Sequence, residues 1–102
     1  MLKEGYIAHW KKYPLDEIKV RVARPSVLGP SKALLKDYKE EKINWAGYTR
    51  RFRKEILGNP KALAKLREIK KLAEMKDVRL ICYEKDPTYC HRRLLVEIIE
   101  SL

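Results

Sequence analysis

The chain has 102 residues and a formal net charge of +10, with 45% hydrophobic and 37% charged residues. This length predicts one domain over residues 1–102 with a single hydrophobic core. No apolar run approaches the about 20 residues that cross a bilayer, and the first residues lack the apolar stretch of a signal peptide. We therefore expect a cytoplasmic protein without a membrane segment.

The excess of 24 Lys and Arg over 14 Asp and Glu has two interpretations. A strongly basic protein can bind a polyanion such as nucleic acid. A charged surface rich in Lys and Glu is also typical of thermophilic proteins, and the chain contains no Gln. The two cysteines are too few for a disulfide framework, so we expect thiols in a reducing cytosol.

Three segments have the patterns of β-strands. Gly5–Trp10 is rich in aromatic residues. Ile18–Arg24 alternates apolar and basic residues, as a half-buried strand does. Val78–Tyr83 is almost continuously apolar, which is typical of a strand buried on both faces.

Four helices are predicted around these strands. Ser31 is a candidate N-cap for a helix through about Lys42, and two more helices are predicted over 45–57 and 60–75 from their apolar spacing. Asp86-Pro87 fits the start of a last helix. The order β–β–α–α–α–β–α predicts an α/β fold with a short, at least partly parallel sheet flanked by helices.

The segment Cys82–Arg93 is the most informative part of the chain. It holds both cysteines, one of the two histidines and a pair of arginines. Ligands of open α/β sheets bind at the carboxyl ends of strands, where Arg24 and Cys82 are both expected. If the two strands are parallel neighbours, Arg24 and this segment converge on one site.

The same residues resemble a known family. Cys82-x-Glu-Lys-Asp-Pro followed by Cys90-His-Arg is similar to the signature of the domain of unknown function 488 family. Two supporting similarities are the helix pattern over 45–55 and the strand that runs into Pro25. The resemblance covers about residues 18–99 and implies an α/β fold with a shared site, but no reaction. The chain departs from the pattern before Arg24, where Val20 and Arg21 stand and many members carry an Asp, so no acidic partner is carried over.

Cys90 is the first candidate for a catalytic residue. A thiol near a helix N-terminus and beside cations can ionise to a nucleophilic or redox-active thiolate. His91 or Glu84 would then transfer the proton. The alternative is that Cys90 is a small apolar residue packed under the helix, and that Glu84 pairs with an arginine.

Four residues are candidates for ligand binding: Arg24, Cys82, Arg92 and Arg93. Arginines beside the N–H groups of a helix start suit a phosphate or another anion. The alternative is that one arginine forms a structural ion pair with Glu84 or Glu55. Cys82 could instead form a redox pair with Cys90, or be inert.

Cys82 and Cys90 could also be two ligands of a zinc site with His91 as the third, but we expect no metal and no other cofactor. The seven residues between Cys82 and Cys90 do not match the two to four residues that normally separate paired zinc-binding cysteines. Adjacent Cys90 and His91 would also point in different directions if both lay on a helix.

A nucleic-acid-binding module is the rival hypothesis, in which the cysteines are structural. Its candidate residues are Arg50, Arg53, Lys54 and Lys65 on two basic helices, which could contact phosphates. Trp45, Tyr48 and Phe52 share one face of the first of these helices and are expected to pack in the core. Our main interpretation is a small α/β protein with an anion-binding, thiol-containing pocket.

Overall fold

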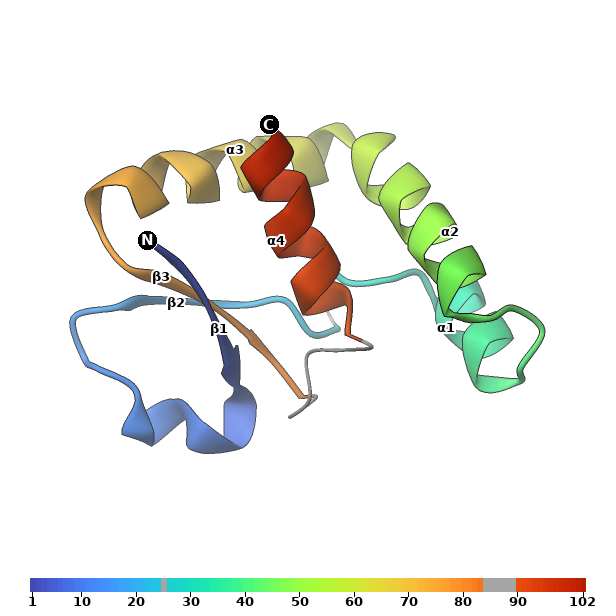
Figure 1. The fold of residues 1–102 in the computed structure, drawn as a ribbon, viewed down its shortest axis with the longest axis horizontal. Coiled ribbons are helices and arrows are strands. Elements are labelled where there is room, and N and C mark those ends of the chain that lie inside the picture. Colours follow the sequence, from blue (N-terminus) through green and yellow to red (C-terminus); the bar gives the residue numbers. More distant parts are fainter. Residues whose placement is uncertain (25, 84–89) are drawn as a thin grey trace.

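The computed structural model describes residues 1–24, 26–83 and 90–102. The elements are β1 (Leu2–Tyr6), the 3-10 helix η1 (Ile7–Lys12), β2 (Ile18–Arg21), α1 (Lys32–Lys39), α2 (Trp45–Leu57), α3 (Pro60–Met75), β3 (Val78–Cys82) and α4 (His91–Ser101) (Figure 1). This order confirms the predicted α/β fold. None of the helices in the described part of the chain has the length and hydrophobicity that crossing a membrane requires.

The sheet is parallel and has the strand order β1-β3-β2. Leu2 of β1 and Ile18 of β2 both pair with Val78, the first residue of β3. Because the three strands start in register and run the same way, their carboxyl ends meet at one edge of the sheet. The predicted parallel pairing of the strand before Arg24 (β2) with the strand that ends in Cys82 (β3) is therefore confirmed.

The two faces of the sheet are covered by different segments. Val78, Leu80 and Cys82 belong to the hydrophobic core that the helices complete, and Figure 1 shows α3 and α4 on the upper side of the sheet with η1 below it. Arg79 lies on the opposite parity of β3 and contacts the connection between β1 and β2. The central strand is thus buried on both faces, as its apolar sequence predicts.

The first strand is displaced from its predicted position. It covers Leu2–Tyr6 rather than Gly5–Trp10, and the aromatic residues that follow form η1. Tyr6 is paired with Cys82, where β3 ends. Because β3 ends at this pair, the residues after Tyr6 have no partner in β3 with which to continue the ladder. The β-propensity of the aromatic residues is therefore not enough to make them part of the strand.

The helices follow their local signals closely. Ser31 and Asn44 cap α1 and α2 by accepting hydrogen bonds from the Leu34 and Gly47 amides. The first helix ends at Lys39 rather than about Lys42, because Glu41 adopts a left-handed conformation with φ of 60°. The predicted start of the last helix at Asp86-Pro87 lies outside the described residues.

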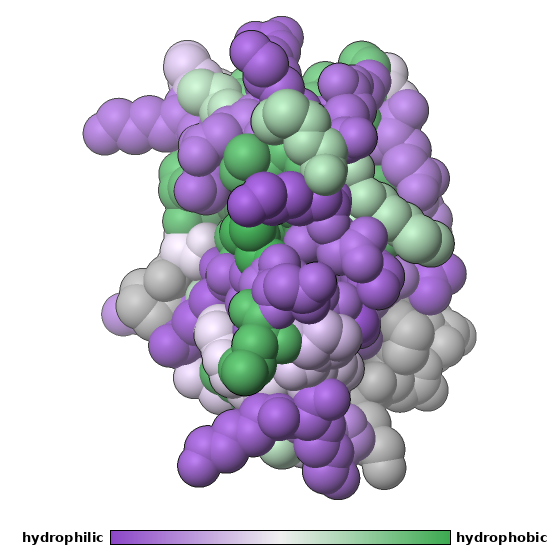
Figure 2. Space-filling model, turned by 90° about the vertical axis from the view of Figure 1, so that its left-hand side faces the viewer, coloured by the Kyte–Doolittle hydropathy of each residue, from purple (hydrophilic) through white to green (hydrophobic). Residues whose placement is uncertain are grey.

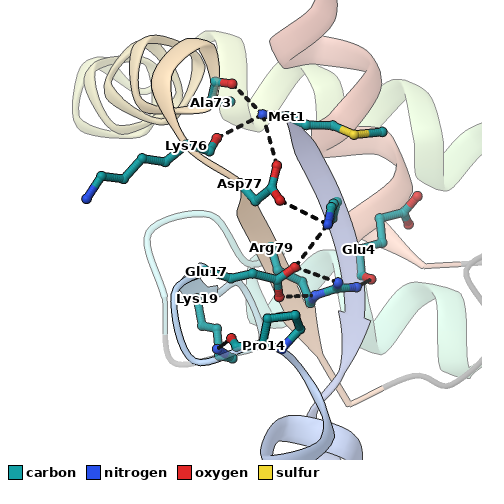
Figure 3. A network of polar contacts seen from close by, with 10 residues as sticks. Met1, Glu4, Pro14, Glu17, Lys19, Ala73, Lys76, Asp77 and Arg79 are labelled. Carbon is teal, nitrogen blue, oxygen red and sulfur yellow. Dashed lines mark hydrogen bonds and ion pairs between the residues drawn. The ribbon is translucent and has the colours of Figure 1, made fainter.

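A network of charged groups joins β1, β3 and the loop before β2 (Figure 3). The Glu17 carboxylate is buried and accepts two hydrogen bonds from the Arg79 guanidinium, at 2.7 and 2.8 Å. Lys3 binds the same carboxylate and also Asp77. This end of the molecule is covered mainly by hydrophilic side chains, between which only small hydrophobic patches are visible (Figure 2).

Candidate functional site

A cavity of about 450 Å³ lies where the carboxyl ends of β2 and β3 meet the start of α4. Its volume is within the range of small-molecule sites. The residues that line it are Ala23, Arg24, Pro30, Leu35, Tyr38, Lys39, Trp45, Tyr48, Cys82, Tyr83, Cys90 and His91. Four residues predicted from the sequence are therefore brought together here: Arg24, Cys82, Cys90 and His91.

The two cysteines and His91 form a buried cluster at the cavity. The Sγ atoms of Cys82 and Cys90 are 3.3 Å apart, and the Cys82 Sγ lies 4.0 Å from the Nδ1 of His91. All three residues are less than 10% exposed. The two sulfurs are in contact but are not joined by a disulfide.

The backbone of Cys90 explains how adjacent side chains meet. Cys90 is the N-cap of α4 and has an extended conformation, with φ of −134° and ψ of 136°. His91 is the first residue in the helix. Adjacent side chains diverge when both residues are helical, and Cys90 is not.

A hydrogen bond of His91 determines which of its two ring nitrogens carries the hydrogen when the ring is neutral. Nε2 lies 2.7 Å from the backbone oxygen of Val22. A carbonyl oxygen can only accept, so Nε2 carries the hydrogen. The Nδ1 atom then has an unshared electron pair, and it is this atom that lies toward the Cys82 sulfur.

The environment of Cys90 does not favour a thiolate. The contact with the Cys82 sulfur, together with burial, raises the pKa of the Cys90 thiol above its usual range. The amide of the α4 backbone acts in the opposite direction and is the smaller effect. Burial and the Cys82 contact thus oppose the effect of the helix N-terminus, and the role of Cys90 as a nucleophile stays a prediction.

The arginines separate into two groups. Arg24 is exposed and lines the cavity, whereas Arg92 and Arg93 are not among its lining residues. Arg92 is 2% exposed, forms an ion pair with Glu4 at 3.2 Å, and donates to the backbone oxygen of Gly5. Arg93 pairs with the same carboxylate at 2.9 Å. Glu4 is thus a structural partner of both arginines. Of the two partners predicted from the sequence, Glu55 accepts from Ser31 instead, and Glu84 lies outside the described residues.

Aromatic residues form one wall of the cavity. Trp45 and Tyr48 are stacked with centroids 4.9 Å apart, and the Tyr38 ring is 5.0 Å from that of Tyr48. Burial raises the pKa of Tyr48 above its usual range, so its phenol keeps its hydrogen. Tyr48 and Phe52 are buried as predicted.

Sequence reasoning missed Tyr38 and Lys39 as lining residues. They lie in the last turn of α1, and their position depends on how α1 packs against α2. Glu84, the predicted proton-transfer group, lies outside the described residues.

The residues proposed for nucleic-acid contact lie elsewhere. Arg50 and Lys54 are exposed on α2, and Arg53 is partly exposed on the same helix. Lys65 of α3 is 3.7 Å from Glu68, a partly solvated pair. None of these four lines the cavity, so nucleic-acid binding stays a separate prediction.

The comparisons with known proteins give one result. The model of the family DUF488-N3a, described as the active DUF488-N3 subclade, matches residues 19–102. The match includes Arg24 and the whole Cys82–Arg93 segment. No curated protein and no solved structure is significantly similar to the chain.

Proposed function

The chain belongs to the DUF488 family, and we propose that its cavity binds a small anionic ligand that has a flat, apolar part. The observation that carries this proposal is the composition of the lining, which combines two cations (Arg24 and Lys39), aromatic rings and the Cys82–Cys90–His91 cluster. Such a convergence of a few polar groups in a mainly apolar cavity is typical of ligand sites.

The anionic part of the ligand would interact with Arg24. This side chain is exposed, and its guanidinium can form two parallel charge-assisted hydrogen bonds with a phosphate or carboxylate. Lys39 lines the same cavity and adds a second positive charge. The first turn of α4 also abuts the cavity, and its amide groups favour negative charge.

The flat part of the ligand would contact the aromatic wall. Stacked aromatic rings such as those of Trp45 and Tyr48 favour a further planar group in offset or edge contact. The Tyr48 phenol, which keeps its hydrogen, can donate to an acceptor on the ligand. A nucleoside monophosphate combines these features and is a suitable probe.

Tryptophan fluorescence offers a direct test. The chain has two tryptophans, of which Trp10 lies in η1 and Trp45 lines the cavity. In a Trp10→Phe background, we expect adenosine monophosphate to change the fluorescence of Trp45 in a saturable way. Inorganic phosphate should compete more weakly, because it lacks the flat part.

Arg24→Ala should weaken this binding by about tenfold or more, since a hydrogen bond to a charged group contributes about 1.5–3 kcal/mol. The matched control is Arg53→Ala, which removes the same charge from α2 away from the cavity. If both variants weaken binding equally, or if affinity only follows salt concentration, the ligand contacts the basic surface in general and the nucleic-acid hypothesis gains support. No change in Trp45 fluorescence would contradict the proposal.

A further inference from the structure

The cluster of Cys82, Cys90 and His91 has the donor atoms of a transition-metal site. The ligand atoms, two sulfurs and one ring nitrogen, lie within 4.8 Å of one another. We propose that these three residues bind a zinc ion through the Sγ atoms of Cys82 and Cys90 and the Nδ1 of His91. This inference goes beyond ligand binding in the cavity, because a metal can bind here without any anionic ligand.

The distances fit a tetrahedral ion after small adjustments. Zinc lies about 2.3 Å from a cysteine sulfur and about 2.0–2.1 Å from a histidine nitrogen, which places two sulfurs about 3.8 Å apart and a sulfur and a nitrogen about 3.6 Å apart. In the structure the sulfurs of Cys82 and Cys90 are 3.3 Å apart, and the Cys82 sulfur is 4.0 Å from Nδ1 of His91. The third pair, the Cys90 sulfur and the His91 nitrogen, lies within 4.8 Å. Side-chain rotations that move the donor atoms by up to about 1 Å would therefore accommodate the ion.

His91 is already oriented as a ligand. Metal-binding histidines almost always donate their other ring N–H to a carboxylate, a backbone carbonyl or water, which fixes the ring and the nitrogen that binds. Nε2 of His91 makes this contact with the Val22 carbonyl at 2.7 Å. The nitrogen with the unshared electron pair is therefore Nδ1, the one beside the sulfur of Cys82.

The charge balance suits a buried site. On binding, Cys82 and Cys90 each release one proton to solvent, and the two thiolates neutralise the charge of the divalent ion. The product carries no net charge, which lowers the cost of burying it. Two sulfurs and an imidazole also select zinc over calcium or magnesium, which prefer oxygen ligands.

The proposed ion would face the cavity. Cys82, Cys90 and His91 all line it, so the fourth position of a tetrahedral ion is open to water or to a donor atom of a ligand. Zinc with three protein ligands and one exchangeable position is typical of catalytic sites, whereas structural sites use four protein ligands.

The first experiment uses the native chain, stripped of metal and kept reduced. Cobalt(II) added alone should bind once per chain and give the visible bands of a tetrahedral ion together with near-ultraviolet charge transfer from thiolates. Zinc should then displace the cobalt and remove both signals. Weak octahedral cobalt without thiolate charge transfer would overturn the proposal, as would binding at other than one ion per chain.

Variants identify the ligands. Cys82→Ser, Cys90→Ser and His91→Gln should each weaken zinc binding, measured against a chromophoric chelator, by more than the about 10–100-fold that the loss of an outer hydrogen-bond partner costs. His9→Gln, at the other histidine of the chain, is the matched control and should bind normally. If all three variants retain the affinity of the native chain, the site is not this cluster. If a variant does not fold, as judged by circular dichroism, the cobalt spectrum of the native chain still decides.

Discussion

Arg92→Ala is expected to lower the free energy of unfolding by about 3 kcal/mol, because it leaves a cavity where a buried side chain stood and removes two hydrogen bonds of a charged group. The Arg92 guanidinium is 2% exposed and binds both the Glu4 carboxylate and the Gly5 backbone oxygen. Through these contacts it joins the first turn of α4 to β1. The loss is measured by urea unfolding followed by circular dichroism.

Arg93→Ala is a matched control for this prediction. Arg93 pairs with the same carboxylate of Glu4, but 48% of its side chain is exposed. An exposed pair contributes about 0–1 kcal/mol, so the variant should unfold at nearly the native urea concentration. If the two variants lose equal stability, the burial of Arg92 does not make its contacts stronger than those of the exposed Arg93. If Arg92→Ala is fully stable but no longer binds adenosine monophosphate, Arg92 belongs to the ligand site after all.

The parts of the fold with local signals could be predicted from the sequence. The bounds of α2 and α3 agree with the prediction because Asn44 and Pro60 mark the helix starts through their own backbone and side-chain geometry. The parallel pairing of β2 and β3 follows from the helices between them. These features together place Arg24 and Cys82 at the same edge of the sheet.

The features that depend on packing could not be predicted. The strand predicted over Gly5–Trp10 does not include Glu4, so the sequence does not identify Glu4 as a partner of Arg92 and Arg93. The approach of Cys90 to His91 depends on the extended backbone of Cys90, whereas Asp86-Pro87 suggests an earlier helix start. Tertiary contacts, rather than residue types, decide both outcomes.

Glu17→Gln should lower the free energy of unfolding at neutral pH by about 3 kcal/mol, since it removes the charge that the buried Arg79 contact requires. The side chain of Glu17 is 1% exposed and that of Arg79 is 14% exposed. The hydrogen bonds from Arg79 hold the pKa of the Glu17 carboxyl at about 2, below its ordinary value of 4.5. The Arg79 guanidinium also lies over the Tyr13 ring, 4.1 Å from its centroid. The substitution should therefore also weaken the packing of the connection between β1 and β2 against the sheet.

The depressed pKa of Glu17 gives this prediction a definite pH dependence. A carboxyl with a lower pKa in the folded state stabilises the protein fully above the pKa of the unfolded chain, and this contribution is lost as the pH falls through 4.5 toward 2. The difference in the free energy of unfolding between the native chain and Glu17→Gln should therefore be largest near neutral pH and become smaller in acid. Asp16→Asn, at the exposed neighbouring position, should follow the native profile. If the profiles of Glu17→Gln and Asp16→Asn coincide, the Glu17–Arg79 pair does not hold the connection between β1 and β2 against the sheet.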